Sequence, residues 1–512
     1  MFRSIKRIWV QHPLTFVMVL AVFFRLLAVI FARGFGMIDD HFLAIESAQS
    51  WVDGYDYNSW LPGSPHNQGP TGHNFFFPGL HYLLFSFFKY IRLNDPQVKM
   101  LIVRFLNAGW SLLTVWFGFK ITERISDKKT AGLAGLLLAI LWFMPWVSVR
   151  DLVEVICIPM LVLAIWFIVS REHQPGQFWV WFLAGIFLGL AFNIRPQTVF
   201  FSAGVGLAAL ILRKFREFAG LILGAVIPVL LIQGTIDYFI WGKPFVEIIQ
   251  YFRGNFEEAS AYIVLPWYNY FLVVLGMLIP PVSFFLFFGF LREWKRHLLI
   301  FLPVALFFIL HSAFPNKQER FILPILPFII ILGAAGWQEF ASRSGFWQKR
   351  PGLLRACWIF FWVINLLFLP AVSTVYSKRS RVETMSYLSR YPDIKAILVD
   401  DANESPEMFP RFYLGQWPKM YDEFIGKQNT DSLLLLSSHR PADRQPRFIL
   451  FTGDRDLRAR VIDARNYFPY LAYETTIEPG LVDIVMHKLN PVNKVNRVYI
   501  YRNTWFIPDK IR

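Results

Sequence analysis

The sequence predicts an all-α protein that crosses a membrane many times and ends in a small α/β domain outside the membrane. Hydrophobic residues make up 55% of the 512 residues and charged residues only 17%, a balance that suits a bilayer better than a soluble core. Apolar runs of roughly 17 to 24 residues recur before Ser377, and each is long enough to cross a hydrocarbon layer of about 30 Å. Beyond Ser377 the composition becomes mixed polar and charged. We therefore expect a membrane domain over residues 1–376 and a soluble α/β domain over residues 377–512.

Hydropathy predicts about eleven membrane-spanning helices. The first follows a basic N-terminus and lacks a small-residue cleavage site, which indicates a signal anchor. Two arginines, Arg25 and Arg104, lie within spans and need partners there. The spans are expected near Pro13–Phe31, Val98–Ile121, Ala131–Trp146, Leu152–Val169, Phe178–Ala191, Thr198–Leu212, Phe218–Trp241, Tyr268–Phe290, Leu298–Leu310, Phe321–Trp337 and Ala356–Val375.

A further apolar stretch, Phe75–Ile91, is expected to lie in the membrane interface. Its His81, Lys89 and Arg92 fall on one helical face, as a helix lying on a membrane requires. If this stretch crossed the membrane, every later basic cluster would lie opposite the basic N-terminus, against the positive-inside rule. The interfacial assignment makes residues 32–97 the first external loop and places the C-terminal domain outside the cytoplasm.

The net charge of +15 does not indicate a nucleic-acid partner, because Lys and Arg cluster beside the apolar runs as the positive-inside rule predicts. The two cysteines, Cys157 and Cys357, both lie inside apolar runs. Their spacing fits no metal site, and we expect no disulfide between them. The lipid bilayer is therefore the partner that the composition indicates.

The C-terminal domain contains three strand-like runs between helical or turn-rich stretches, at Ala396–Asp400, Arg447–Thr452 and Leu481–Met486. It has no glycine-rich phosphate loop and no cluster of His or Cys. The sequence predicts no catalytic chemistry in this domain.

Two adjacent carboxylates, Asp39 and Asp40, follow the first span. Placed just outside the bilayer, they can supply a general base that takes the proton from an attacking hydroxyl group. The alternative is a structural role in which one of them caps the helix expected to run through Ala44, Ala48 and Trp51. Both interpretations fit the residues alone.

A second polar segment, Asn316 to Phe321, lies in an external turn between two spans. Lys317 and Arg320 are three residues apart and can hold a phosphate, Arg by two parallel hydrogen bonds and Lys as a point charge. The alternative is that both side chains extend to the interface and that Glu319 merely pairs with one of them.

Single charged and aromatic residues are expected on the same external side. Arg195 precedes Pro196 at the end of a span, and Glu154 lies within another membrane segment. A charge at membrane depth is costly unless it is paired or faces water, so such residues often mark a site. The external loops also carry Arg150 and the aromatic pair Trp267 and Tyr268, which suits sugar stacking or an ordinary interfacial belt.

These segments resemble, in order and spacing, the motifs of glycosyltransferase family 22, the mannosyltransferases of the dolichol and GPI-anchor pathways, within the C-type superfamily of lipid-carrier-dependent enzymes. The resemblance covers residues 35–340. It rests on Ile38-Asp39-Asp40-His41-Phe42, Arg104-Phe105-Leu106-Asn107-Ala108, Ser148-Val149-Arg150 with Glu154, Arg195-Pro196, Asp237 to Gly242, Pro266-Trp267-Tyr268-Asn269-Tyr270 and Asn316 to Pro324.

The chain departs from the family pattern at three of these positions. Asn316 and Gln318 stand where the family has His and Glu, and Ile38 stands where the family favours Pro. The tail beyond Ser377 lies outside the resemblance. An extracytoplasmic C-terminal domain is similar to that of the bacterial aminoarabinose and protein mannosyl transferases of the same superfamily.

The resemblance implies the C-type glycosyltransferase fold and an inverting transfer of a sugar, expected to be mannose, from a polyprenyl-phosphate carrier to a lipid-linked glycan or other extracytoplasmic acceptor. Asp39 is the expected general base, and Asp40 assists in placing the substrates. The expected ligands of the donor phosphate are Lys317, Arg320, Arg195 and Arg150. The expected substrate-binding residues are His41, Glu154, Trp267, Tyr268 and Glu319. Because these cations can neutralise a monophosphate, no metal or other cofactor is expected.

Other functions also fit a polytopic chain with charges at membrane depth. A transporter or flippase of a glycolipid is one alternative, although the chain shows no internal repeat of the kind common in transporters. Others are a different C-type transferase, protein mannosyl- or aminoarabinosyl-like, and an inactive glycan-binding member. The unmatched tail and the lack of a retention signal favour a bacterial inner membrane, with the endoplasmic reticulum as the alternative.

Overall fold

The computed structural model describes residues 9–67, 69–171, 174, 177–257, 264–402, 408–421, 438–439, 441, 445–489 and 497–505. The chain forms two compact units. The first, which we call the helical unit, consists of Met1–Phe31, Ser59–Leu80 and Ile102–Thr374. The second, the sheet unit, consists of Ala32–Asn58, His81–Leu101 and Val375–Arg512. The sheet unit thus includes two pieces of the segment that the sequence assigned to the first external loop.

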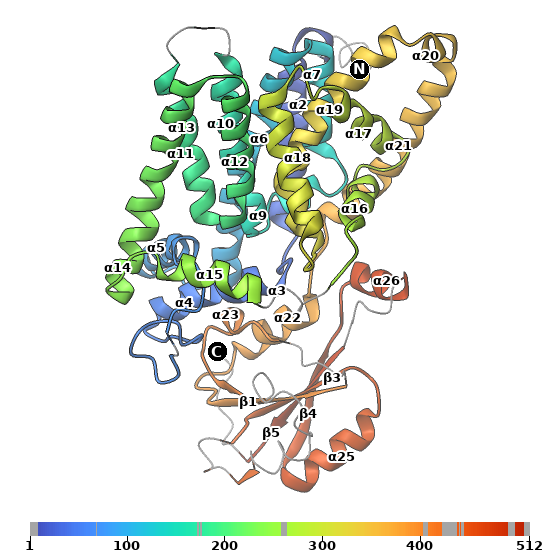
Figure 1. Cartoon of the computed structure of the whole chain (residues 1–512). Helices are drawn as coiled ribbons and strands as arrows, with labels where there is room; N and C mark the ends of the chain where they lie inside the picture. The colour runs from blue at the N-terminus through green and yellow to red at the C-terminus, as the bar shows by residue number, and fades with distance from the viewer. Residues whose placement is uncertain are drawn as a thin grey trace. The chain divides into compact units, whose positions relative to one another are not determined.

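The helical unit is built almost entirely of helices (Figure 1). Two of its helices, α5 and α6, continue into the sheet unit. The helices are α2 (Pro13–Phe31), α5 (Phe76–Tyr90), α6 (Pro96–Ile125), α7 (Lys128–Ile140), α8 (Met144–Val147), α9 (Val153–Ile156), α10 (Ile158–Ser170), α11 (Phe178–Ile194), η2 (Pro196–Thr198), α12 (Val199–Ile211), α13 (Phe215–Pro228), η3 (Val229–Gly234), α14 (Thr235–Trp241), α15 (Val246–Glu257), α16 (Asn269–Met277), α17 (Val282–Arg292), α18 (Leu298–Ala313), η4 (Glu319–Ile325), α19 (Leu326–Arg343), α20 (Gly345–Lys349) and α21 (Pro351–Ser373).

Six helical segments in the described part of the chain are long and apolar enough to cross a membrane, and the number rises to seven if α16 and α17, bent by 117°, form one broken span. Three shorter apolar helices accompany them: Phe178–Ile194, Pro196–Ile211 and Leu298–Ala313. The six are Pro13–Phe31, Pro96–Ile125, Val153–Ser170, Phe215–Trp241, Glu319–Arg343 and Pro351–Ser373. The prediction of a multi-pass helical protein is confirmed, whereas the count of eleven spans stays a prediction.

Small residues allow the helices of this unit to approach closely. Helices α11 and α13 lie side by side (Figure 1). A Cβ atom added at Gly185 would lie 2.2 Å from the carbonyl oxygen of Leu221, and one added at Gly224 would lie 2.0 Å from that of Phe182. Contacts this short exclude any side chain at these positions, so the two backbones pack directly, as is common between helices in membranes.

The two arginines within the predicted spans have partners in the helical unit. The Nε of Arg25 donates to the Ser111 hydroxyl at 2.8 Å, and its Nη1 donates to the Ala139 carbonyl at 3.1 Å. The Nε of Arg104 donates to the Val29 carbonyl at 2.9 Å. Backbone carbonyls near the ends of α7 and α2 thus accept hydrogen bonds from these two buried guanidinium groups.

The sheet unit contains a five-stranded sheet of order β2-β1-β3-β5-β4, in which β2, β1 and β3 are parallel and β5 is antiparallel to β3 and β4. Helix α25 packs against one face through Val461 and Ala464 (Figure 1), while α22 contacts β4 and β5. The strands are β1 (Ala396–Asp401), β2 (Lys419–Met420), β3 (Phe448–Thr452), β4 (Leu471–Ile477) and β5 (Val498–Asn503), and the helices are α22 (Arg379–Leu388), α23 (Arg411–Leu414), α25 (Leu457–Tyr467) and α26 (Leu481–Leu489).

Two of the three strand predictions are confirmed and one is wrong. Strands β1 and β3 lie where the sequence placed them, but the run Leu481–Met486 belongs to helix α26. A six-residue apolar run fits a strand and a helix equally well, and its periodicity does not decide between them.

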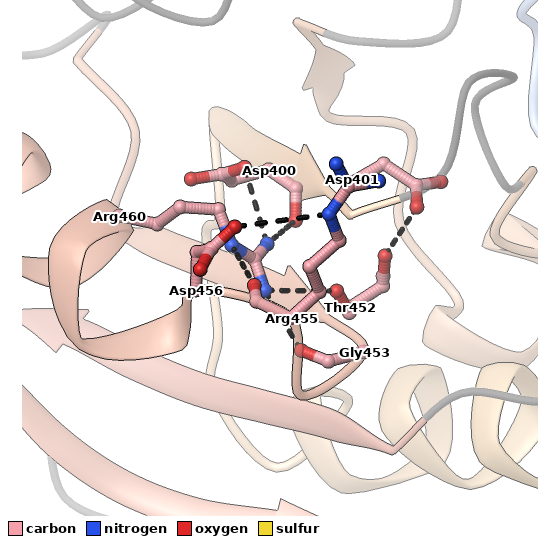
Figure 2. Close-up of polar contacts among 7 residues, drawn as sticks. All are labelled: Asp400, Asp401, Thr452, Gly453, Arg455, Asp456 and Arg460. Carbon is pink, nitrogen blue, oxygen red and sulfur yellow. Dashed lines mark hydrogen bonds and ion pairs between the residues drawn. The ribbon is translucent and has the colours of Figure 1, made fainter.

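A single arginine joins the carboxyl ends of β1 and β3 (Figure 2). Arg460 of α25 donates through Nη1 to the Asp400 carbonyl at 3.0 Å and through Nη2 to the carbonyls of Thr452 and Gly453 at 3.1 and 2.7 Å. Its Nη1 also lies 3.3 Å from a carboxylate oxygen of the buried Asp400. Arg460 therefore adds side-chain hydrogen bonds to backbone carbonyls at the point where the two parallel strands end.

The segment after α2 is part of the sheet unit. The Ser377 amide donates to the Arg33 carbonyl at 3.1 Å, and Gly34 forms a bridge with Ser377. Gly34 has a φ of +73°, and a Cβ atom there would lie 1.9 Å from the Ser377 carbonyl oxygen, so only glycine fits. The chain then forms three short helices: α3 (Ile38–Asp40), the π-helix η1 (His41–Glu46) and α4 (Ser47–Val52).

Candidate active site

The helical unit contains a buried carboxylate between two guanidinium groups. One oxygen of Glu154, in α9, lies 3.0 Å from Nη1 of Arg195 and 3.4 Å from Nε of Arg320. Glu154 is fully buried, and both arginines are nearly so. We call these three residues the arginine cluster. Because one carboxylate faces two guanidinium groups, the cluster carries one net positive charge.

The Arg-Pro sequence explains how Arg195 reaches this position. A residue before proline is driven out of the helical region, and Arg195 accordingly has φ −136° and ψ 98°, which ends α11. Pro196 then opens η2 at a position where a missing amide hydrogen costs nothing. Arg195 therefore lies at the break between α11 and η2.

Several buried polar atoms of this turn have no hydrogen-bond partner among the described residues. They are Nε and Nη2 of Arg195, Oδ1 of Asn193, Oε1 of Gln197 and Oγ1 of Thr198. Buried polar atoms are normally paired, and leaving each one unpaired costs about 1–3 kcal/mol. The turn at residues 193–198 therefore has donors and acceptors that could bind a polar ligand.

Phe321 shields the arginine cluster. The guanidinium carbon of Arg195 lies 4.8 Å from the centre of the Phe321 ring, and that of Arg320 lies 5.5 Å from it. An aromatic face attracts both cations and limits their access to water. A cation that is partly withdrawn from water interacts more strongly with an anion.

A mostly apolar cavity of about 360 Å³ adjoins this turn. Gln197 and Phe321 line it, together with the aromatic residues Phe200, Tyr251, Phe252, Phe256 and Phe314. His311 and Asn316 are among its polar lining residues. A cavity of this kind, apolar with a few polar groups at one side, suits a ligand that has a long apolar part and a small polar part.

The turn that carries Lys317 is held mainly by its own chain. The Lys317 ammonium donates to the Phe314 carbonyl, and burial lowers the pKa of Lys317. The side-chain oxygen of Gln318 accepts a hydrogen bond from Nε of Arg320 at 2.9 Å. The backbone amide of Gln318 donates to the Tyr270 hydroxyl at 3.3 Å. The structure thus joins Arg320 to Arg195 and Glu154, whereas Lys317 shapes the turn between α18 and η4.

The remaining predicted residues of the helical unit lie in varied surroundings. Arg150 lies over the Trp146 ring at 4.7 Å. Trp267 and Tyr268 are 72% and 46% exposed and contact each other edge to face. Glu319 is exposed at the start of η4. The structure therefore gives Glu154 a position between two arginines, and its predicted direct contact with substrate stays a prediction.

The acidic pair belongs to the sheet unit and lies in α3. Asp40 is 9% exposed and has helical backbone angles, and its side chain makes no capping hydrogen bond to the π-helix that follows. Asp39, the residue before it in α3, is exposed. His41, the residue after Asp40, is 2% exposed, and its Nε2 lies 3.6 Å from a carboxylate oxygen of Glu46.

Sequence reasoning missed a second buried acidic cluster in the helical unit. The Glu247 amide donates to Oδ2 of Asp237 at 3.0 Å, and Oδ1 of Asp237 accepts from Gln233 at 2.8 Å. Glu247 in turn accepts from the Gly72 amide at 2.7 Å. The pKa of Glu247 is raised to about 7, mainly by burial. The hydrogen bond from the Gly72 amide lowers this pKa, and the nearby charge of Asp237 raises it. Asp237 stood in a family-like segment, but nothing in the sequence singled out Glu247.

In the described residues, no three of His, Cys, Asp and Glu are grouped as metal ligands would be. The expectation that the protein needs no metal or other cofactor stays a prediction.

A model of the Alg9-like mannosyltransferase family matches residues 14–405. The chain belongs to this family. The match extends from α2 to just beyond β1 and includes every residue of the arginine cluster and of the acidic pair. The rest of the sheet unit, from residue 406 onward, lies beyond the match.

Known members of the family are distant in sequence. The chain is 26% identical to GPI mannosyltransferase 3 of Saccharomyces cerevisiae over 177 residues, which are 32% of this chain and 28% of that protein. It is 22% identical to GPI mannosyltransferase 3 of Candida albicans over 62% of this chain and 63% of that protein. The chain thus matches less than two thirds of the length of these relatives.

Among solved structures, the chain is similar to ArnT from Cupriavidus metallidurans bound to undecaprenyl phosphate. The TM-score is 0.59 at 12% identity, over 97% of this chain and 99% of that one. An identity this low shows a shared fold and no more. The Alg9-like chain therefore has a fold of the C-type glycosyltransferases, as the sequence predicted.

Proposed function

We propose that this protein transfers mannose from a polyprenyl-phosphate carrier to a lipid-linked glycan acceptor, with inversion at the anomeric carbon. The single observation that carries the proposal is the arginine cluster in a member of the Alg9-like mannosyltransferase family. Both curated relatives described above are named as GPI mannosyltransferases. A glycolipid acceptor is therefore the chemistry that the relatives favour.

The charge of the arginine cluster suits the donor phosphate. A sugar linked to a lipid carrier by one phosphate is a diester with a single negative charge, which balances the single net positive charge of Glu154, Arg195 and Arg320. As the bond from the sugar to the phosphate breaks, the phosphate gains negative charge, so fixed guanidinium groups stabilise the transition state more than the bound donor. Nε and Nη2 of Arg195, which have no hydrogen-bond partner among the described residues, are the donors that we assign to the phosphate oxygens.

The acidic pair supplies the base in this proposal. An acceptor hydroxyl oxygen attacks the anomeric carbon, its proton passes to Asp39, and the carrier phosphate leaves with the bonding electrons. Asp40 and His41 place the acceptor. A single displacement from the face opposite the phosphate inverts the anomeric configuration, and no covalent intermediate forms.

The apolar cavity would hold the first part of the carrier lipid. Phe321 lines this cavity and also lies against Arg195, so a phosphate on Arg195 would place the attached isoprenoid near the cavity. The ArnT structure of similar fold was solved with undecaprenyl phosphate, a lipid of the same class. Arg150 and Lys317 would add positive charge around the phosphate, and Trp267, Tyr268 and Glu319 would contact the sugar or the acceptor.

The proposal includes an arrangement in the membrane. About eleven spans, with α5 in the interface, would place the acidic pair and the sheet unit outside the cytoplasm. The comparisons give no support to a bacterial inner membrane, and the curated relatives from two fungi are consistent with the endoplasmic reticulum. We therefore propose the endoplasmic reticulum membrane, with the site on its lumenal face.

The test is transfer by the purified full chain in liposomes, with polyprenyl-phosphate mannose labelled in the sugar and a glycolipid extract as acceptor. We expect label in the glycolipid fraction, release of carrier phosphate in equal amount and an inverted linkage. Asp39→Asn should abolish the transfer of label and the release of carrier phosphate. Asp95→Asn, a control at the start of α6, should leave both reactions unchanged. Labelled donor that crosses the bilayer with no release of carrier phosphate would contradict the proposal and favour a flippase.

A further inference from the structure

The acidic pair leads directly into a π-helix whose polar ends are buried. Asp40 is the residue before η1, His41 is its first residue and Glu46 its last. His41 and Glu46 are 2% and 0% exposed. A π-helix is less favourable than an α-helix and persists mainly where a functional site requires its geometry. The conformation around Asp40 therefore depends on what holds His41 and Glu46.

The His41 ring stacks with two aromatic rings, one near it in the sequence and one far from it. The first is Phe35, with ring centres 4.8 Å apart and planes 19° apart. Tyr413 of α23 is stacked at 5.6 Å with planes 9° apart. Phe412 meets the same ring edge to face at 6.0 Å. The residue beside Asp40 is thus fixed by a helix that lies more than 360 residues later in the sequence.

Glu46 connects the same two segments by a hydrogen bond. The Phe412 amide donates to Oε1 of Glu46 at 3.0 Å, and Nε2 of His41 lies 3.6 Å from the same oxygen. Removing the partners of a completely buried carboxylate lowers the stability of the fold by several kcal/mol. The contact between α23 and the π-helix is therefore a specific one, which includes a buried hydrogen bond, a ring stack and an edge-to-face ring contact.

Other contacts fix the flanks of this segment within the sheet unit. At its start, Ser377 pairs with Arg33 and Gly34, as described above. Toward its end, Nε1 of Trp417 donates to a carboxylate oxygen of Asp53 at 3.0 Å. The segment that carries the acidic pair is held at its start, middle and end by residues beyond 375.

We infer that α23, through Phe412 and Tyr413, positions the acidic pair for catalysis, and that Glu46 and His41 transmit this constraint. Phe412 and Tyr413 lie beyond the part of the chain that matches the Alg9-like family, which ends at residue 405. The C-terminal part of the sheet unit is thus a component of the active site even though it supplies no reacting group. The inference depends on the proposed role of Asp39 and Asp40.

The test compares two buried tyrosines of the sheet unit. Tyr413→Met removes the ring stacked on His41 and keeps an apolar side chain, while Tyr391→Met makes the same change at a site that packs on Phe448 and β5. Tyr413→Phe keeps the stack. All rates are measured on the purified full chain and are expressed per folded protein, as determined by size-exclusion recovery.

We expect Tyr413→Met to lower kcat by roughly 10- to 100-fold, because small displacements of a catalytic group cost that much. The KM for the donor should stay within about twofold, since donor binding is assigned to the helical unit, and the low-pH limb of the kcat profile should move. Tyr413→Phe should restore kcat and the profile. Tyr391→Met should lower the folded yield and leave kcat per folded protein unchanged.

A second comparison covers the case in which Tyr413→Met is not recovered folded. Glu46→Gln keeps an acceptor for the Phe412 amide and should retain kcat, whereas Glu46→Leu should lose it. Equal kcat in Tyr413→Met and Tyr391→Met, or in the two Glu46 variants, would overturn the inference. If kcat is equal in these variants while Asp39→Asn and Asp40→Asn abolish transfer in the same assay, only the positioning role of α23 is wrong. If both keep full transfer, the proposed function has failed instead.

Discussion

Glu154 is the residue on which the arrangement of charges depends. It is fully buried, and one of its carboxylate oxygens lies 3.0 Å from Arg195 and 3.4 Å from Arg320. The sequence indicated Glu154, Arg195 and Arg320 as separate candidates. It did not indicate that one carboxylate would pair with both arginines. Glu154 lies in α9, Arg195 at the break after α11 and Arg320 in η4, and no local sequence pattern relates these three segments.

Replacing this carboxylate should destabilise the protein. Glu154→Gln removes the buried carboxylate from its ion pairs with Arg195 and Arg320, and breaking a buried pair costs about 3–5 kcal/mol. We expect a lower midpoint of thermal unfolding in detergent. Glu257→Gln removes a carboxylate that is 61% exposed and pairs with Arg253 on the surface, so the midpoint should not change. Equal midpoints for the two variants would contradict the role of Glu154.

At the scale of elements, the sequence predicted regular structure well where the pattern was long. Spans such as α2 and α21 lie where hydropathy placed them, and the buried strands β1 and β3 were predicted as well. Strands β4 and β5 were missed because they mix polar and aromatic residues, and β4 is only partly buried. The α26 run was misassigned because six residues cannot separate a period of 2 from one of 3.6.

The contact of α15 with the loop at Gly72 should depend on pH. Glu247 has a pKa of about 7 in the folded protein, raised from 4.5 mainly by burial. A carboxylic acid with a raised folded pKa stabilises the fold at low pH, and this contribution is lost as the pH rises through the folded value. We expect the midpoint of thermal unfolding of the wild type to decrease as the pH rises from about 4.5 to about 7.

The variant Glu247→Gln isolates this effect. Because its side chain does not titrate, the same pH range should change its unfolding midpoint less than that of the wild type. Glu257→Gln, on the same helix but exposed, should retain the wild-type pH dependence. An identical pH dependence in wild type and Glu247→Gln would show that Glu247 does not titrate there.

The carboxyl ends of β1 and β3 should loosen without Arg460. Arg460→Met removes the donors shown in Figure 2, and a hydrogen bond from a charged donor contributes about 1.5–3 kcal/mol. Hydrogen exchange should become faster in peptides that cover residues 396–402 and 448–453. Arg458→Met changes an exposed arginine of the same helix and should leave both peptides unchanged. Unchanged exchange in Arg460→Met would exclude this role.

At the scale of the whole molecule, the division into two units was only partly visible in the sequence. The change in composition at Ser377 predicted a C-terminal sheet, but not that residues 32–58 and 81–101 fold with it. The bond between Glu46 and Phe412 joins residues 366 positions apart, and periodicity carries no information at that separation. The acidic pair was therefore predicted as a site in an external loop, without the partners that hold the loop.

The central claim is that Arg195 and Arg320 bind the phosphate of a lipid-linked mannose. The most direct measurement is donor binding by the purified Arg195→Gln protein, with labelled polyprenyl-phosphate mannose in nanodiscs and Arg253→Gln as an exposed control on α15. Loss of a charge-assisted contact of about 1.5–3 kcal/mol predicts affinity weaker by roughly 10- to 150-fold in Arg195→Gln and unchanged in Arg253→Gln. Wild-type donor affinity in a folded Arg195→Gln protein would contradict the claim.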